Sequence, residues 1–177
     1  MPLIIAKDDI TTLSVDAIVN AANCGLKNYA RRRGGGVCGA VFRAAGHDAM
    51  QAACDAIGGC ETGSVVITGG FALPAKWVIH AVGPRYSEGD PNQAALLGQC
   101  YRAALDLCES NGLSTVAFPL ISSGIFGYPR EEALQIATNA ILSWLSDHGD
   151  KKTVYLCLVD EALYSVALNI MNGRQLI

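Results

Sequence analysis

Two glycine-rich loops contain the residues of this chain whose types and spacing could bind a charged ligand. The first is Gly-Gly-Gly-Val-Cys-Gly at 34–39, and the second is Ile-Ser-Ser-Gly-Ile-Phe-Gly at 121–127. The first lies downstream of Val-Asn-Ala-Ala-Asn at 19–23, where an apolar run typical of a strand ends, and the second follows such a run directly. Each precedes a pattern typical of a helix. Backbone N–H groups at such a helix N-terminus bind phosphate without needing a lysine. Two loops from separate strands therefore predict a ligand whose diphosphate is held from two sides.

Three polar side chains at strand ends and one aromatic ring in the second loop could contact such a ligand. Asn20 and Asn23 end the second strand, where an amide can donate to and accept from ribose hydroxyls or a water. Capping of a turn is the alternative role for both, and for Asn20 it is the favoured one. Asp9 could accept a hydrogen bond from an exocyclic amine, although its spacing fits a helix N-cap or a solvated turn better. Phe126 either closes off a sugar or lies in the core of a tight turn.

Two other classes of site fit these loops less well. A dinucleotide-binding Gly-x-Gly-x-x-Gly needs a strand directly before it and an acid about 20 residues later at a strand end. Here three arginines at 31–33 precede the glycines, and Asp55 falls inside a helical pattern. A plain helix-entry turn explains one glycine but not three, because each glycine costs backbone entropy. The second loop has no Gly-x-Ser-x-Gly, so it does not indicate a nucleophile elbow.

The seven cysteines and three histidines form no pattern typical of a metal site or a disulfide framework. An odd number of cysteines without Cys-x-x-Cys favours a reducing compartment. The histidines are widely spaced and include no His-Glu-x-x-His. We therefore expect no metal held by protein ligands.

Composition bounds the class of protein. At 177 residues, 51% hydrophobic and 16% charged, the sequence predicts one domain with a substantial core. A net charge of −3 argues against a surface built for nucleic acid. The N-terminal apolar run is too short for a signal peptide, and no apolar stretch approaches the ~18 residues that span a bilayer. We therefore expect a cytoplasmic protein with no membrane partner.

Strand-like and helix-like runs alternate along the chain. Apolar and β-branched runs predict strands at 3–6, 17–20, 64–68, 77–82, 115–120 and 154–159. Apolar spacing predicts helices at 92–109, 129–148, 162–171 and 37–57, the last broken at Gly46 with Asp48 as an N-cap. The strands at 115–120 and 154–159 are apolar throughout, which indicates burial on both faces. The pattern predicts an α/β fold, a three-layer α/β/α sandwich on a mixed, mainly parallel sheet. Both glycine-rich loops then follow carboxyl ends of strands and can share one cleft.

Six stretches, in the right order, resemble the macrodomain family. They are Asp9-Ile10-Thr11, the run at 16–23, the glycine loop running into Ala44-Ala45-Gly46, Glu61-Thr62-Gly63, the run at 77–84 and the run at 119–129. As a set they cover nearly the whole chain and are far more specific than the glycine motif alone. The resemblance implies one macrodomain over 1–177 that binds ADP-ribose or ADP-ribosylated protein, as a monomer and without a cofactor.

The resemblance also implies roles for individual residues. Asp9 would bind the adenine amine, and Asn23 would address the distal ribose beside Phe126. Val159 and Asp160 stand where many members carry an aromatic residue against adenine, which predicts apolar packing without stacking. The ligand-binding residues implied in this way are Asp9, Ile10, Ala22, Asn23, Gly34, Gly35, Gly36, Val37, Pro119, Ser122, Ser123, Gly124, Ile125, Phe126, Val159 and Asp160.

Two departures from the family leave catalysis open. Members resembling the mono-ADP-ribosyl and O-acetyl-ADP-ribose hydrolases carry an Asp where this chain has Cys38, and a histidine or similar residue where Val41 and Phe42 stand. The segment at 24–33 is also longer here. Cys38 could act as a base only with a lowered pKa, which a helix N-terminus and the arginines at 31–33 would favour. The commoner role of such a cysteine is that of a small buried hydrophobe.

Three functions therefore stay open. An enzyme would cleave an ADP-ribosyl ester or release acetate from O-acetyl-ADP-ribose, with Asn23 orienting a water and the bound diphosphate assisting its deprotonation. Asn23 is then the first catalytic candidate and Cys38 the second. A non-catalytic reader would bind ADP-ribosylated proteins and stop there. A binder of poly-ADP-ribose or nucleic acid would use the arginines at 31–33 as a basic rim, an option that the acidic net charge disfavours.

Overall fold

The computed structural model describes residues 2–30 and 33–174, and within them six strands form one sheet. The strands are β1 (Leu3–Ala6), β2 (Ala17–Ala22), β3 (Val65–Gly69), β4 (Trp77–Val82), β5 (Thr115–Phe118) and β6 (Thr153–Cys157). Their order is β1-β6-β5-β2-β4-β3. Only β3, paired with β4, runs antiparallel to its neighbour in this sheet. The predicted mixed, mainly parallel sheet is confirmed.

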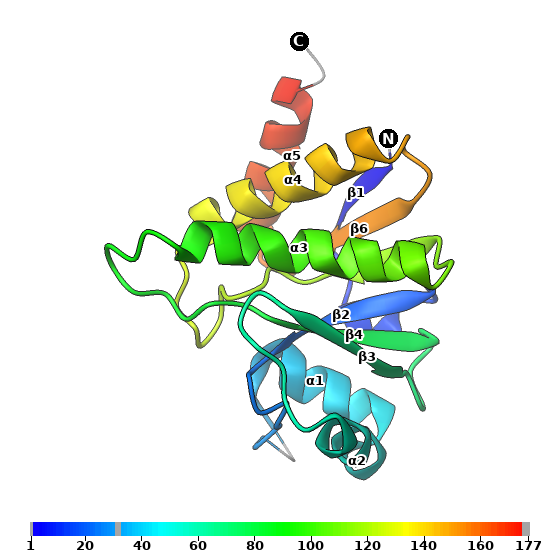
Figure 1. Ribbon diagram of the computed structural model, residues 1–177. Coiled ribbons are helices and arrows are strands. Elements are labelled where there is room, and N and C mark those ends of the chain that lie inside the picture. Colours follow the sequence, from blue (N-terminus) through cyan, green and yellow to red (C-terminus); the bar gives the residue numbers. More distant parts are fainter. Residues whose placement is uncertain (1, 31–32, 175–177) are drawn as a thin grey trace.

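Helices cover both faces of the sheet (Figure 1). They are α1 (Gly36–Ala45), α2 (His47–Ile57), α3 (Gln93–Ser110), α4 (Arg130–Asp147) and α5 (Glu161–Arg174), with a short 3-10 helix, η1, at Ile10–Thr12. In Figure 1, α3 lies above β2, β4 and β3, and α1 and α2 lie below these strands. The three-layer α/β/α sandwich expected from the sequence is therefore confirmed.

Alternate residues of each central strand enter different halves of the core. Val19 of β2 packs in the cluster that includes α3, α4 and α5, whereas its neighbour Ile18 packs in the cluster that includes α1 and α2. Both side chains are fully buried. This burial on two faces explains the continuous apolar runs in the strand sequences.

Element boundaries agree with the sequence prediction to within a few residues, and two differences have clear causes. β5 ends at Phe118 rather than at 120 because Pro119 has no N–H for the ladder. β2 continues to Ala22 because its pairing with β4 runs on to Val82.

The prediction of Asp48 as an N-cap is wrong. Gly46, at φ 97°, precedes α2 and offers no side chain, and Asp48 lies within the first turn of that helix. The break of the helical run at Gly46 itself is confirmed. Across 2–30 and 33–174, no helix combines the length and apolar character required to cross a membrane.

Candidate functional site

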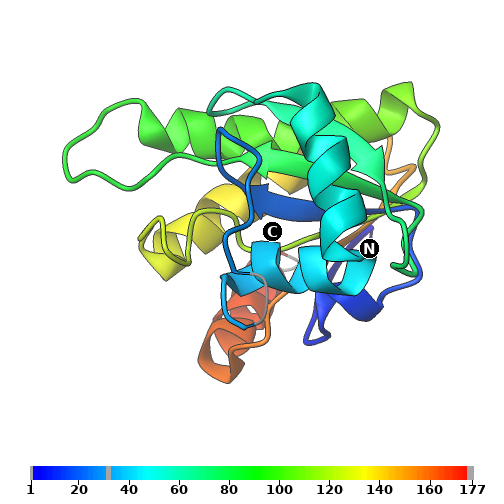
Figure 2. The ribbon, with the colours of Figure 1, turned by 90° about the horizontal axis from the view of Figure 1, so that it is seen from below.

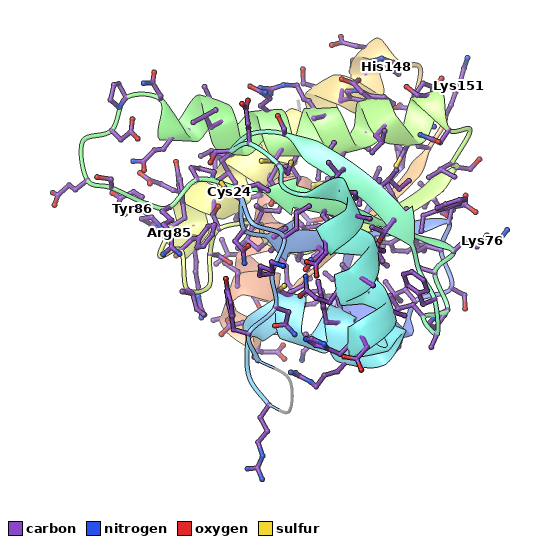
Figure 3. The ribbon with its side chains drawn as sticks, turned by 60° about the horizontal axis from the view of Figure 1, so that its bottom comes forward. Cys24, Lys76, Arg85, Tyr86, His148 and Lys151 are labelled. Atoms are coloured by element: carbon purple, nitrogen blue, oxygen red, sulfur yellow. The ribbon has the colours of Figure 1, made fainter. Side chains whose placement is uncertain are left out.

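A cavity of about 1020 Å³ opens where β2, β4 and β5 end. The segments that follow these three strands emerge together at the left of Figure 1, and Figure 2 shows the same end from below. In Figure 3, Cys24, Arg85 and Tyr86 lie at this end, while Lys76, His148 and Lys151 lie at the other. Residues 35–38 and 120–126 both line the cavity, so the structure brings the two glycine-rich loops into one cleft.

The first loop has a conformation that only glycine adopts freely. Gly34, Gly35 and Gly36 have φ angles of 70°, 75° and 57° in succession. Behind them, a Cβ at Gly39 would collide with the carbonyl oxygen of Gly34, so the start of α1 packs directly against the loop. Among the described residues, the N–H groups of Gly36 and Val37 have no partner. They are available to an anion at the N-terminus of α1.

Arg43 and Gln51 hold the chain that leads into this loop. The guanidinium of Arg43 donates to the carbonyl oxygens of Gly34 and Ala30, at 2.9 and 3.1 Å. The Gln51 amide donates to the carbonyl oxygen of Leu26 at 2.9 Å and accepts from the N–H of Asn28 at 3.0 Å. Residues 24–30, which belong to the longer segment at 24–33, are thus fixed to α1 and α2.

The second loop contains a strained serine. Ser122 has φ 66°, a left-handed conformation that costs a non-glycine residue on the order of 1–3 kcal/mol. Its hydroxyl is buried and has no hydrogen-bond partner within the described part of the chain. Strain and an unpaired buried hydroxyl in one cavity-lining residue are typical of a ligand-binding position.

Gly83 lets the second loop approach β4. A Cβ at Gly83 would collide with Ser122 Oγ and Ile121 Cγ2. Beyond Ser122, the N–H groups of Gly124, Ile125 and Phe126 have no partner among residues 2–30 and 33–174. These amides give the cavity a second set of donors opposite the first loop.

Phe126 is half-buried at the cavity edge, neither free nor in the core. The guanidinium carbon of Arg85 lies 4.5 Å from the centre of its ring, within the range of a cation–π contact. The N–H of Tyr86 donates to the carbonyl oxygen of Phe126 at 2.8 Å. The loop after β4 therefore holds the ring in place.

Asn23 lines the cavity but uses its amide to close a turn. Nδ2 donates to the carbonyl oxygen of Lys27 at 2.7 Å, and Oδ1 accepts from the N–H of Lys27 at 3.1 Å. One amide hydrogen and one oxygen lone pair remain for a ligand or a water. The two roles that the sequence left open for Asn23 are thus compatible.

Asn20 lies in a buried polar chain beneath the first loop. Its Nδ2 donates to His80 Nδ1 at 3.0 Å, so His80 Nε2 carries the proton and donates to Thr68 Oγ1 at 2.9 Å. Burial lowers the pKa of His80 to about 4. Asn20 Oδ1 is buried without a partner in the described chain. Asn20 thus caps no turn; it joins β2 to β4.

Cys38 lies above this chain, in the first turn of α1, with its sulfur 3.7 Å from Asn20 Nδ2. Burial raises the pKa of the Cys38 thiol. This is opposite to the lowered pKa that a catalytic base would need, so the geometry favours packing. Arg31 and Arg32, named as a possible cause of a lowered pKa and as a basic rim, lie outside the described residues; Arg33 is exposed.

Several residues expected at the ligand lie outside the cavity lining. They are Asp9, Ile10, Gly34, Pro119, Val159 and Asp160. Asp9 follows β1 and caps η1: its Oδ1 accepts from the N–H and the hydroxyl of Thr11, at 2.9 and 2.8 Å. Ile10 is buried, and Val159 is 72% exposed. Asp160 Oδ1 accepts from the N–H of Leu163 at the start of α5.

Sequence reasoning did not single out four residues that shape the site, one glycine and three polar side chains. Gly83 and Arg85 follow β4, and Arg43 and Gln51 come from α1 and α2. Only Gly83 had a local signal, because a glycine directly after a strand often marks close backbone approach. Within residues 2–30 and 33–174, no group of three or more His, Cys, Asp or Glu side chains is arranged to hold a metal ion.

Known proteins share this sequence and this fold. Residues 19–137 match the family described as Macro domain. The chain is 47% identical to the Macro domain-containing protein RSc0334 of Ralstonia nicotianae, over 91% of each chain. It is 46% identical to the ADP-ribose glycohydrolase MACROD1 of Mus musculus, over 89% of this chain and 49% of that protein, which is about twice as long.

A solved structure extends the comparison to the fold. A variant of the Oceanobacillus iheyensis macrodomain, determined with ADPR (ADP-ribose), superposes with a TM-score of 0.89 at 36% identity, covering 99% of this chain and 94% of that one. The family match covers residues 19–137, and the likeness in sequence and fold to these relatives extends over nearly the whole chain. The chain belongs to the Macro domain family.

Proposed function

We propose that this chain, folded as one domain, binds ADP-ribose in the cavity at the carboxyl ends of β2, β4 and β5. The observation that carries the proposal is that two loops with unpaired backbone amides line one cavity of about 1020 Å³. The relatives support it, since one is named an ADP-ribose glycohydrolase and another was determined with ADP-ribose.

The diphosphate fits between the two loops. The N–H groups of Gly36 and Val37 face it from α1, and those of Gly124, Ile125 and Phe126 face it from the loop after β5. The unpaired Ser122 hydroxyl supplies a further donor. Amides arranged in this way bind a dianion by hydrogen bonds and dipoles, without a fixed cation. The distal ribose then lies near Asn23 and Phe126.

Calorimetric titration tests the two-loop arrangement. ADP-ribose should bind far more tightly than AMP or adenosine, because only the larger ligand places a second phosphate and a distal ribose against both loops. ADP should fall between them. Equal affinities for AMP and ADP-ribose would contradict the proposal.

Asp9 is the proposed acceptor for the adenine amine. Because its carboxylate also accepts hydrogen bonds from Thr11, the test needs a substitution that keeps this cap of η1. Asp9→Asn retains an oxygen that can cap η1 but places an NH₂ group where the second carboxylate oxygen stood. ADP-ribose should then bind more weakly by about 1–3 kcal/mol. The inosine analogue lacks the amine and should bind both proteins nearly alike. If the variant binds ADP-ribose as well as wild type does, Asp9 only caps η1.

Hydrolysis is a second candidate function, favoured by the 46% identity to a glycohydrolase. In this chain the raised pKa of Cys38 argues for a neutral thiol, so the base would be the diphosphate of the substrate acting on a water held by Asn23. Asn23 keeps one hydrogen and one lone pair for that water. The acid residue expected in the loop is absent, and a non-catalytic reader is the alternative.

Two variants separate these functions. Wild type is incubated with an automodified ADP-ribosyl protein and with O-acetyl-ADP-ribose, and the loss of each is followed. Asn23→Ala should lower turnover more than affinity, the signature of an interaction made mainly in the transition state. Cys38→Ala should keep most activity. If Cys38→Ala binds ADP-ribose but no longer turns over substrate, the thiol takes part in the reaction. If wild type shows no turnover, the domain is a non-catalytic reader.

A further inference from the structure

A second cavity lies beside the first and shares no lining residue with it. Its volume is about 360 Å³, and it lies between the loop that follows β4 and the first turns of α3 and α4. Its walls include Tyr86, Asp90, Gln93, Tyr128 and Glu132. The two cavities are neighbours along the chain, since Arg85 lines the first and Tyr86 lines the second.

The walls of this second cavity suit an organic cation. The rings of Tyr86 and Tyr128 meet at 5.2 Å with an angle of 68° between their planes, which makes two steeply inclined aromatic walls. The carboxylates of Asp90 and Glu132 add negative charge, and no Lys, Arg or His is among the described lining residues. A lysine or arginine side chain is attracted both by aromatic faces and by carboxylates.

Tyr128 offers its phenol group to a ligand in this cavity. Its side chain is 3% exposed and lines this cavity, and its hydroxyl oxygen, which has no hydrogen-bond partner in residues 2–30 and 33–174, is accessible to solvent. Burial raises the pKa of Tyr128, and the charges of Glu132 and Asp90 add to that rise, so both carboxylates lie close to the phenol. The phenol oxygen can accept a hydrogen bond from an ammonium or guanidinium group.

Hydrogen bonds anchor the loop between the cavities. Gln93 fixes it by donating to the carbonyl oxygen of Ser87 and accepting from the N–H of Ser87, both at 2.9 Å. The N–H of Tyr86 holds the carbonyl oxygen of Phe126 at the rim of the first cavity. Phe126, which lines the first cavity, and Tyr86, which lines the second, are thus joined by a direct hydrogen bond.

We propose that the cavity formed by Tyr86, Tyr128, Asp90 and Glu132 binds a lysine or arginine side chain of the polypeptide whose ADP-ribosyl group occupies the first cavity. The inference rests on the proposed function for its biological setting. The site itself, a pocket for one basic side chain, is independent of it.

The first test needs no ADP-ribose. N-acetyl-lysine methylamide, N-acetyl-arginine methylamide and the uncharged N-acetyl-norleucine methylamide are titrated into the protein, and NMR signals of Tyr86 and Tyr128 are followed. The two cations should give saturable shifts, and the norleucine compound should not. Equal binding of all three compounds, or no saturable shift with the cations, would overturn the proposal.

Variants locate the effect. Asp90→Asn combined with Glu132→Gln should weaken binding of the cations by about tenfold, as expected for two partly exposed carboxylates. Tyr128→Phe keeps the aromatic ring but removes the hydroxyl, and it should weaken binding of the cations a few-fold. Asp147→Asn, at the far end of α4, removes a charge without touching the cavity and should leave the affinity unchanged. If Asp147→Asn loses as much affinity for the cations, the net charge of the protein, and not the cavity, causes the effect.

The second test separates this inference from the proposed function. ADP-ribosylated peptides are compared with lysine or with norleucine near the modified residue. Wild type should prefer the lysine peptide, and the Asp90→Asn/Glu132→Gln variant should lose the preference while binding free ADP-ribose normally. If free ADP-ribose does not bind, the proposed function fails and the first test still decides on the pocket. If ADP-ribose binds but both peptides bind alike, the present inference fails.

Discussion

The two ends of the parallel strands differ in how their polar groups are satisfied. At the amino end, Asp16 accepts hydrogen bonds from the N–H groups of Ser114 and Thr115, at 2.8 and 3.1 Å. Lys152, although buried, donates to the carbonyl oxygen of Leu113 and pairs with Glu109 at 2.8 Å. At the carboxyl end, Ser122 Oγ and Asn20 Oδ1 are buried without partners in the described chain.

The backbone shows the same contrast. The carboxyl end has three consecutive left-handed glycines and a left-handed serine next to unpaired amides. Strain and unpaired donors lower stability unless a ligand uses them. The polar groups at the amino end therefore stabilise the fold. Those at the carboxyl end lower the free energy of unfolding but are available to a ligand.

The largest expected effect comes from placing a negative charge between the two loops. Gly124 has an ordinary backbone conformation, and a Cβ there meets nothing within 4 Å, so Gly124→Glu should fold normally. Its carboxylate would repel the diphosphate and lower ADP-ribose affinity by about 100-fold or more. Isothermal titration calorimetry measures this.

Gly69→Glu is the matched control for this substitution. Gly69 also has open space around its Cβ position, and it pairs with Trp77 at the amino end of β4. The Gly69→Glu variant should bind ADP-ribose with the same affinity as wild type. Equal losses in both variants would mean that overall charge, rather than the position between the loops, controls affinity.

Acid should destabilise the fold through His80, beneath the first loop. Burial depresses the pKa of His80 to about 4 in the folded state, below the ordinary value of 6.5, so the unfolded chain binds more protons between these values. Its contribution of about 3 kcal/mol is present above pH 6.5 and is lost as pH falls towards 4. Urea unfolding across that range measures the slope, and His80→Gln should flatten it. An unchanged slope in the variant would assign the effect to other groups.

Asp16→Ala should cost about 2 kcal/mol of unfolding free energy, because two backbone N–H groups would lose a charged acceptor. These hydrogen bonds, the one from Ser114 first, lower the pKa of Asp16. Its contribution is therefore present above the ordinary pKa and is lost as pH falls through the lowered one. Denaturation with urea checks the size, and Asp16→Asn, which keeps an acceptor, is the control. Affinity for ADP-ribose should not change; a parallel loss would contradict the division between the two ends.

Ser122→Ala should give the smallest effect and the sharpest contrast. It removes an unpaired hydroxyl, so unfolding free energy should hold steady while ADP-ribose affinity falls by about 1 kcal/mol. Thr138→Val is the opposite case, because the buried Thr138 hydroxyl already donates to the carbonyl oxygen of Leu134 at 2.9 Å. That variant should lose stability and keep affinity. The reverse outcome in either variant would contradict the assignment.

The sequence predicted the layers, the sheet type and both loops, because periodicity and glycine content are local signals. It could not find the partners that tertiary contacts supply. Nothing near His80 in sequence shows that Asn20 and Thr68 hydrogen-bond to its ring. For Cys38 the sequence left two roles open, a base with a lowered pKa and a small buried hydrophobe. Burial, which local sequence does not reveal, raises the pKa of the thiol and favours the second role. The Asp48 prediction failed because a glycine one position before the helix took the capping place.

The most direct test of the contrast between the ends is an amide NMR titration with ADP-ribose. We expect large shifts and slowed hydrogen exchange for five amides whose N–H groups lack partners in the described chain, those of Gly36, Val37, Gly124, Ile125 and Phe126. The amides of Ser114 and Thr115, already bonded to Asp16, should not move. Shifts confined to one loop, or shifts of equal size at both ends of the sheet, would contradict the account.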